Sequence, residues 1–118
     1  MNVCLIGDGL ISLTLAKTLI NKKIKVFMYY ENNRKISNDN RTIGISSDNI
    51  DFIQKKIVKI NKNLIWGIKK IEIYNDKNTK EKILNFQQSN KILFSIIKNN
   101  DLYKLLFLIM ENNLLFDC

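Results

Sequence analysis

The pattern of apolar and polar residues divides residues 1–31 into three short elements. Residues 2–6 form an apolar run that stops at Gly7, which is typical of a buried strand in a parallel sheet. Apolar residues recur at helical spacing over residues 10–20, which predicts an amphipathic helix. Residues 25–30 are rich in aromatic and apolar side chains and predict a second strand that closes with Glu31.

The rest of the chain predicts an inserted helix and a hairpin. The polar residues 32–40 predict a loop, after which Ser47 or Asp48 caps a helix running to about Ile60. One face of that helix carries four isoleucines, Ile50, Ile53, Ile57 and Ile60. The part-alternating residues 68–74 predict a strand that turns at 75–79 and pairs with residues 82–86.

The last third repeats the change from strand to helix. Residues 92–97 are a short apolar run, and Asn99 or Asn100 caps a helix that continues to about residue 112. Residues 114–116 begin one more strand. The order of elements predicts a single α/β domain over residues 1–118, with an insertion in its sheet. A right-handed crossover would place the second strand parallel to the first and next to it.

Composition narrows the chemistry. The 118 residues are 46% hydrophobic and 25% charged, which is normal for a globular domain. The chain has no histidine, which excludes a histidine base, the common zinc sites and a Ser-His-Asp triad within it. Cys4 and Cys118 lie at opposite ends and give no metal spacing, and Cys4 is expected to be a small core residue.

Neither a targeting signal nor a bilayer span is visible in the sequence. Asp8 interrupts the N-terminal apolar stretch, and the apolar run at 102–110 is too short to cross a bilayer. A cytoplasmic location is therefore expected. The net charge of +8 comes from lysines scattered along the whole chain, and arginine is present only at positions 34 and 41. Scattered charge without a basic stripe argues against nucleic-acid binding.

The strongest motif is Gly7-Asp8-Gly9-Leu10-Ile11-Ser12, which lies between the first strand and the helix. Gly7 permits a tight turn, and Gly9 lets the backbone approach a pyrophosphate. The N–H groups that open the helix at Leu10 and Ile11 then face the phosphates. Ser12 stands where the fingerprint has Gly or Ala, and Asp8 is expected to point to solvent.

Glu31 ends the second strand, about 24 residues after Gly7, where the fingerprint places a ribose-binding carboxylate. The motif and this carboxylate together predict a Rossmann-like fold that binds FAD or NAD(P), with a 2′-phosphate disfavoured at Glu31. The alternative is a strand-turn-helix corner that uses its glycines only for geometry, with Glu31 solvated.

These residues carry a resemblance. The stretch from Val3 to Glu31 is similar to the start of the FAD-dependent aromatic hydroxylases, especially the polyprenylphenol hydroxylases of ubiquinone biosynthesis. Residues 39–46 (DNRTIGIS) resemble the family's D-x-R-x-x-x-[IL]-[SA] segment. Residues 68–76 look like its IxxIxIYxD strand, and residues 94–102 look like its GYVVEN-x-x-L segment, with Lys98 in place of the usual Glu.

The resemblance implies FAD as the cofactor. Gly7, Gly9 and Glu31 would bind its ADP part, and Arg41 would lie beside the ribityl and pyrophosphate end of the flavin. The family's reaction hydroxylates a phenolic ring with dioxygen, and a nicotinamide nucleotide is the reductant. No side chain of this chain is a candidate acid or base for that reaction.

Length is the main departure from the family, whose members run to several hundred residues. The chain is expected to be an N-terminal portion with an incomplete C-terminal end, not catalytic in isolation, and able to self-associate through an open sheet edge near residues 114–118. NAD(P)H and an aromatic substrate would bind only in a full-length form. Two alternatives stay open, which are a non-catalytic nucleotide-binding or interaction module and, less favoured, a small NAD-dependent enzyme.

Overall fold

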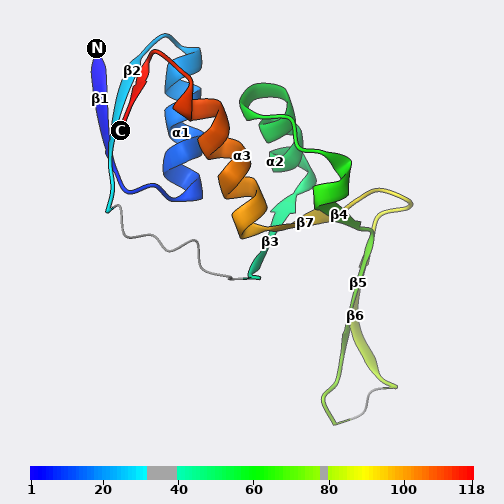
Figure 1. Cartoon of the computed structure of the whole chain (residues 1–118). Coiled ribbons are helices and arrows are strands. Elements are labelled where there is room, and N and C mark those ends of the chain that lie inside the picture. Colours follow the sequence, from blue (N-terminus) through cyan, green and yellow to red (C-terminus); the bar gives the residue numbers. More distant parts are fainter. Residues whose placement is uncertain (32–39, 78–79) are drawn as a thin grey trace.

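The computed structural model describes residues 1–31, 40–77 and 80–118. Strand β1 (Asn2–Ile6) leads through the glycine turn into helix α1 (Leu10–Asn21), and β2 (Lys25–Tyr29) follows. The two strands are adjacent and parallel (Figure 1), and in the ladder Ile6 pairs with Tyr29. This arrangement confirms the β-α-β unit predicted from the sequence.

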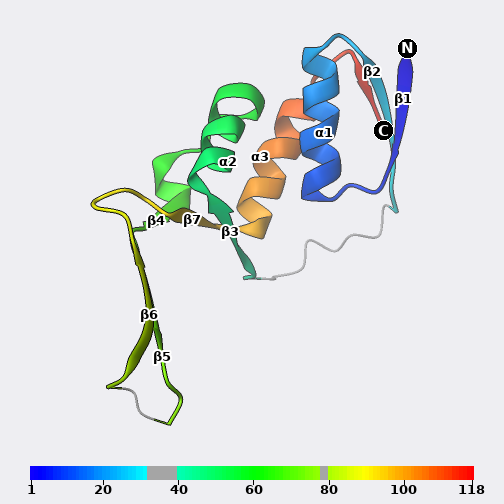
Figure 2. The same cartoon turned by 180° about the vertical axis from the view of Figure 1, so that it is seen from behind.

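The C-terminal end of the chain returns to the same sheet. Strand β8 (Phe116–Asp117) lies parallel to β2, which gives the strand order β1-β2-β8. The predicted last strand is therefore present, although it starts two residues later than expected. Helices α1 and α3 (Asn99–Glu111) lie on one side of this sheet, as both views show (Figures 1 and 2).

The two faces of the parallel sheet differ in burial. Val26 and Met28 of β2 point to the helices and are buried, whereas Cys4, Ile6 and Tyr29 alternate with them on the other face and are exposed. The expectation that Cys4 is a core residue is wrong. The pleat of β1 directs its side chain to the face that none of the described helices covers.

A second, antiparallel sheet has the order β3-β7-β4, formed by β3 (Thr42–Ser46), β7 (Phe94–Lys98) and β4 (Ile65–Ile68). Strand β3 was not predicted from the sequence. Residues 68–74 were predicted as one strand, whereas the chain leaves the second sheet after Ile68 and enters a separate hairpin. Fully buried side chains of α1, α3, β2 and β7 form one core between the two sheets, namely Leu13, Ala16, Leu106, Met110, Val26 and Ile97.

The inserted helix is shorter than expected. Helix α2 (Ser47–Phe52) continues into a π-helical turn, η1 (Ile53–Ile57), and Val58 is already extended. Gln54 fixes this end, because its side chain accepts a hydrogen bond from the Ile60 N–H at 2.9 Å and donates one to the Ile60 carbonyl at 3.2 Å. The predicted apolar face is nevertheless correct, since Ile50, Ile57 and Ile60 are buried and Ile53 is partly buried. A short 3₁₀ helix, η2 (Lys62–Leu64), precedes β4.

The predicted helix caps lie one residue away from the observed ones. Ser46 caps α2 by accepting a hydrogen bond from the Asn49 N–H at 3.4 Å. The residue before α3 is Lys98, and it makes no side-chain cap. In each case the preceding strand supplies the cap position, so the helix begins where strand pairing ends.

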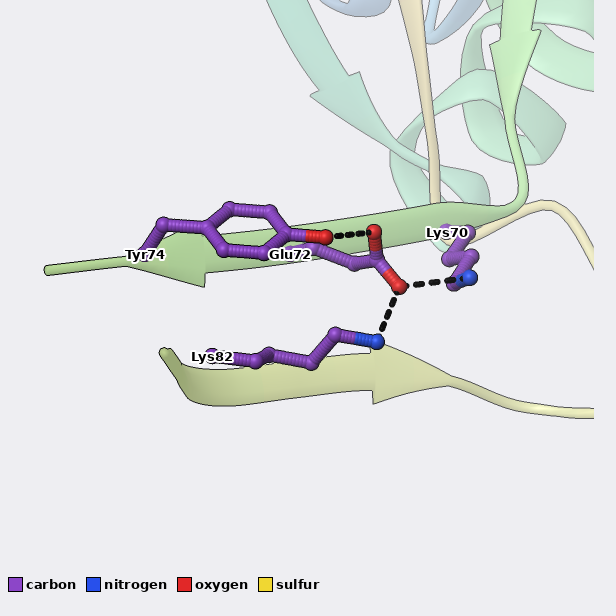
Figure 3. Close-up of polar contacts among 4 residues, drawn as sticks. All are labelled: Lys70, Glu72, Tyr74 and Lys82. Carbon is purple, nitrogen blue, oxygen red and sulfur yellow. Dashed lines mark hydrogen bonds and ion pairs between the residues drawn. The ribbon is translucent and has the colours of Figure 1, made fainter. Parts of the chain in front are cut away.

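Strands β5 (Lys70–Tyr74) and β6 (Lys82–Gln87) pair as the predicted hairpin, which projects away from the rest of the fold (Figures 1 and 2). On its polar face, Glu72 forms ion pairs with Lys70 and Lys82, both at 2.5 Å, and accepts a hydrogen bond from Tyr74 at 2.7 Å (Figure 3). These hydrogen bonds lower the pKa of Glu72 to about 2. Apolar side chains occupy the other face, namely Ile71, Ile73, Leu84 and Phe86.

Candidate functional site

The glycine turn joins β1 to α1 at the carboxyl end of the parallel strands. Gly7 has a φ of +94°, a conformation that side-chain-bearing residues rarely adopt. Its N–H donates a hydrogen bond to the Tyr29 carbonyl at 2.8 Å, which continues the β1–β2 ladder into the turn. A Cβ atom built on Gly7 or on Gly9 would meet no atom within 4 Å. The turn therefore borders open space that a ligand can fill.

Helix α1 presents a bare N-terminus to that space. Gly9 is its N-cap, in an extended conformation with φ −65° and ψ 167°, and it provides no side-chain cap. The first turn of α1 contains no acidic residue. The geometry of a helix leaves the N–H groups of Leu10, Ile11 and Ser12 without an intrahelical acceptor, and the helix dipole makes this end positive. Such an end suits an anion.

Glu31 lies at the same edge of the sheet as the glycine turn. It follows β2 by two residues, and the pairing of Ile6 with Tyr29 aligns the ends of the two strands. Its side chain is exposed. The structure thus brings the predicted phosphate turn and the predicted ribose carboxylate to one edge, while their roles remain predictions.

Asp8 does not point to solvent as expected. Its carboxylate accepts a hydrogen bond from the Tyr103 hydroxyl of α3, with an Oη–Oδ2 distance of 2.6 Å. The Tyr103 ring stacks on Phe107, with ring centres 5.9 Å apart, and Phe107 meets Tyr30 edge-on at 6.3 Å. This aromatic cluster ties the glycine turn to α3 and to the end of β2. Sequence reasoning missed Tyr103, because a contact across 95 residues leaves no local signal.

Tyr30, which directly follows β2, has a raised pKa. Burial is the first cause that raises the pKa of its phenol, and the neighbouring Cys118, Asp8 and Glu111 raise it further. The phenol of Tyr30 therefore feels charged or polar groups of the glycine turn, of α3 and of the residue after β8.

Arg41 directly precedes β3 and has an exposed side chain. Its carbonyl accepts a hydrogen bond at 2.9 Å from the N–H of Asn99, the first residue of α3. Tyr103 follows Asn99 by one helical turn, about 6 Å along the axis. The start of α3 therefore holds the Arg41 segment and, through Asp8, the glycine turn. Residue 39, the acidic member of the D-x-R segment, lies outside the described residues.

An apolar groove begins beside the glycine turn and follows α1. Its volume is about 460 Å³, within the size range of ligand pockets. The two threonines that line it, Thr14 and Thr18, donate their hydroxyl groups to the carbonyls of Leu10 and Thr14 at 2.7 and 2.8 Å. With these hydroxyl groups bonded to the helix backbone, the threonines leave their methyl groups to line the groove. Its other lining residues are Leu10, Ile11, Leu15, Ile43, Ile45, Ile53 and Leu102.

A metal site and a membrane-spanning helix were also sought in the described parts of the chain, and neither was found. Residues 1–31, 40–77 and 80–118 contain no cluster of three acidic, cysteine or histidine side chains that could hold a metal ion. None of the helices described there has both the length and the apolar character to cross a membrane.

Several solved structures share this architecture. The chain is similar in structure to PqsL, a probable FAD-dependent monooxygenase from Pseudomonas aeruginosa, with a TM-score of 0.77 and 16% identity over 99% of this chain and 32% of that one. It is similar to 2,6-dihydroxypyridine-3-hydroxylase from Arthrobacter nicotinovorans, with a TM-score of 0.70 and 11% identity over 98% of this chain and 28% of that one. It is also similar to CtdE, solved in complex with FAD, with a TM-score of 0.57 and 18% identity over 91% of this chain and 26% of that one.

These similarities establish the fold. The chain has the Rossmann-like α/β fold predicted from its sequence, with a parallel β-α-β core and an inserted helix and hairpin. It spans about a third of the length of these proteins, or less. The sequence itself matches no known protein family and no curated protein.

Proposed function

We propose that this chain binds FAD as part of a flavin-dependent monooxygenase. The observation that carries the proposal is the open space at Gly7 and Gly9, which faces the uncapped N-terminus of α1. In this proposal the backbone at Gly7, Gly9, Leu10 and Ile11 holds the diphosphate. The carboxylate of Glu31 accepts hydrogen bonds from the adenosine ribose.

The residues present fit such a cofactor. The turn leaves space for the diphosphate, because a Cβ atom on either glycine would have no atom within 4 Å. The first turn of α1 carries no acidic side chain that would repel phosphate. The carboxylate of Asp8, which lies within the turn, is hydrogen-bonded to Tyr103 on α3.

Arg41 is proposed to meet the ribityl and pyrophosphate part of the cofactor. Its fixed positive charge and forked donors suit phosphate oxygens. The support is its place at the start of α3, the helix that also contacts the glycine turn. A bound flavin would supply the redox and oxygen chemistry, and this chain would position it.

The finer proposal is that the complete enzyme hydroxylates a polyprenylated phenol in ubiquinone biosynthesis, with NAD(P)H as reductant. The sequence resemblance is its main support. The apolar groove beside α1 agrees with it in chemistry, because isoleucine and leucine side chains favour a hydrocarbon ligand over a polar one. The isolated chain is not expected to turn over substrate.

Titration of the purified chain with FAD tests the cofactor proposal. Binding is followed by quenching of flavin fluorescence and by calorimetry, with ADP and riboflavin as partial ligands. The proposal expects FAD and ADP to bind and to raise the midpoint of thermal unfolding, because a ligand that binds only the folded state stabilises it. Riboflavin, which lacks the diphosphate, should bind more weakly than FAD. If FAD and ADP both fail to bind or stabilise the protein, the proposal is wrong.

The second candidate is a non-catalytic nucleotide-binding module, which would need only the open space at the glycine turn and the uncapped start of α1. The same titration separates the two. Equal affinity for ADP and FAD would mean that only the ADP half is held. Tighter binding of FAD would indicate contacts to the flavin half, including those proposed for Arg41.

A further inference from the structure

Asp8 is an acidic residue inside the glycine turn, next to the place proposed for the diphosphate. It is the direct chain neighbour of both Gly7 and Gly9, so its Cα atom lies about 3.8 Å from each of theirs. A diphosphate at this turn carries negative charge, and like charges a few ångströms apart repel each other more strongly as water is excluded. The direction of the Asp8 side chain therefore affects how well the turn can hold phosphate.

The structure directs the Asp8 carboxylate toward helix α3. The hydroxyl of Tyr103 donates a hydrogen bond to Oδ2 of Asp8, with an oxygen–oxygen distance of 2.6 Å. Hydrogen bonds to an ionised acceptor are shorter and about twice as strong as those between neutral groups. The contact is also partly buried, which reduces competition from water. One specific donor on α3 thus holds the carboxylate.

Aromatic packing fixes the position of this donor. Tyr103 and Phe107 are one turn apart on α3, and their rings are stacked, with centres 5.9 Å apart and planes at 19°. Tyr30, which directly follows β2, meets Phe107 edge-on, with ring centres 6.3 Å apart and planes at 88°. The hydroxyl of Tyr103 is therefore in place before a ligand arrives, and ligand binding does not have to order it.

We propose that Tyr103 is a positioning residue of the cofactor site, which holds the Asp8 carboxylate on α3 and away from the diphosphate. This role rests on the proposed function, because it acts at the phosphate turn. With the carboxylate held on α3, the N–H groups at the start of α1 stay available to phosphate. Without the Tyr103 hydroxyl, the carboxylate keeps its charge, loses this hydrogen bond and can rotate toward the diphosphate.

Tyr103→Phe removes the donor and keeps the ring that stacks on Phe107. ADP is the probe, because it carries the diphosphate, and its binding is measured by calorimetry. We expect the affinity for ADP to fall about tenfold, the scale of one hydrogen bond to a charged group. The matched control is Tyr74→Phe, which removes a hydroxyl that donates to Glu72 at 2.7 Å in the projecting hairpin (Figure 3). This control should leave the affinity for ADP unchanged.

Asp8→Asn separates the charge of the side chain from its hydrogen bond. The amide oxygen of asparagine can still accept from Tyr103, but the side chain is neutral. If Tyr103 acts on the charge, Asp8→Asn binds ADP at least as tightly as the wild type, and adding Tyr103→Phe to it changes little. If Tyr103 only shapes the turn, the double variant loses about as much affinity as Tyr103→Phe alone.

Ionic strength gives a second readout that a purely structural role would not move. The Debye length falls from about 10 Å at 0.1 M salt to about 3 Å at 1 M. Repulsion in Tyr103→Phe should then be screened, so the ratio of its ADP dissociation constant to that of the wild type should fall toward one. Circular dichroism checks that each variant is folded. Phe107→Leu, which removes the stacking but keeps both polar groups, is the second variant, and its loss of ADP affinity should likewise disappear in the Asp8→Asn background.

The outcomes distinguish this role from the proposed function. Equal ADP affinity of Tyr103→Phe and the wild type would overturn the role of Tyr103 and leave the proposed function intact. A loss that persists in the Asp8→Asn background or at high salt would also overturn it, as would an Asp8→Asn variant that binds ADP much more weakly than the wild type. A wild type that binds neither ADP nor FAD would refute the proposed function, and the role of Tyr103 with it.

Discussion

Gly7→Ala changes one backbone position and nothing around it. At a φ of +94°, a residue with a Cβ is strained even though the added methyl would meet no atom within 4 Å. Such a conformation costs a non-glycine residue about 1–3 kcal/mol. The smaller conformational freedom of alanine in the unfolded chain offsets about 0.4–1 kcal/mol of this cost. We expect the free energy of unfolding to fall by about 1–2 kcal/mol, a sizeable part of the roughly 5–15 kcal/mol typical of a domain.

Gly9→Ser is the matched control for this change. Gly9 is extended, has no neighbour within 4 Å and caps α1, so serine fits its backbone and is itself a preferred N-cap. Urea unfolding followed by circular dichroism should show a loss for Gly7→Ala and none for Gly9→Ser. Gly9→Ser should bind ADP more weakly than the wild type, because the serine hydroxyl occupies the N–H groups that are proposed to hold phosphate.

The stability of Gly7→Ala tests the conformation of the turn, and the ADP affinity of Gly9→Ser tests the phosphate site. Unchanged stability of Gly7→Ala would mean that the left-handed turn is not required. Wild-type ADP affinity in a folded Gly9→Ser would show that phosphate does not approach the start of α1, and the proposed cofactor site would then be wrong.

Three other variants probe separate contacts. Glu31→Gln should weaken ADP binding about tenfold, the loss of a charged hydrogen bond of about 1.5 kcal/mol, and should narrow the preference for ADP over 2′,5′-ADP in calorimetry. Tyr103→Phe should lower the free energy of unfolding by about 1–2 kcal/mol in urea, because the Asp8 carboxylate loses the hydrogen bond from Tyr103; an effect as small as that of a surface change would mean the contact is absent. The pKa of Glu72 is lowered from 4.5 to about 2, so its ionised form stabilises the hairpin above pH 4.5 and this stabilisation is lost as the pH falls toward 2. Amide exchange across that pH range should show this loss in the wild type but not in Glu72→Gln.

Local patterns were enough to predict the β-α-β unit. The apolar run before Gly7, the helical spacing after Leu10 and the aromatic segment ending near Glu31 each depend on neighbours within a few residues, and the structure confirms all three elements. The hairpin and α3 were predicted for the same reason. The prediction was less accurate where an element depends on distant partners. Strand β3 exists because β7 pairs with it from about fifty residues away, and residues 42–46 alone carry no clear strand pattern.

In the candidate site, too, the residues of a local motif could be predicted and the contact between distant residues could not. The glycines and Glu31 belong to a motif that can be seen in the sequence, because one loop and one strand end carry it. The fate of Asp8 could not be predicted, since a carboxylate between two glycines normally faces solvent and its partner Tyr103 lies on the last helix.

Helix α3 is therefore more than a cover for the sheet. Its first residue holds the backbone of Arg41, and its next turn holds the side chain of Asp8. One rigid element thus fixes two segments that are some thirty residues apart in the sequence and that the proposed cofactor would have to contact together. A rotation of α3 would move both at once, whereas a change in the projecting hairpin would move neither.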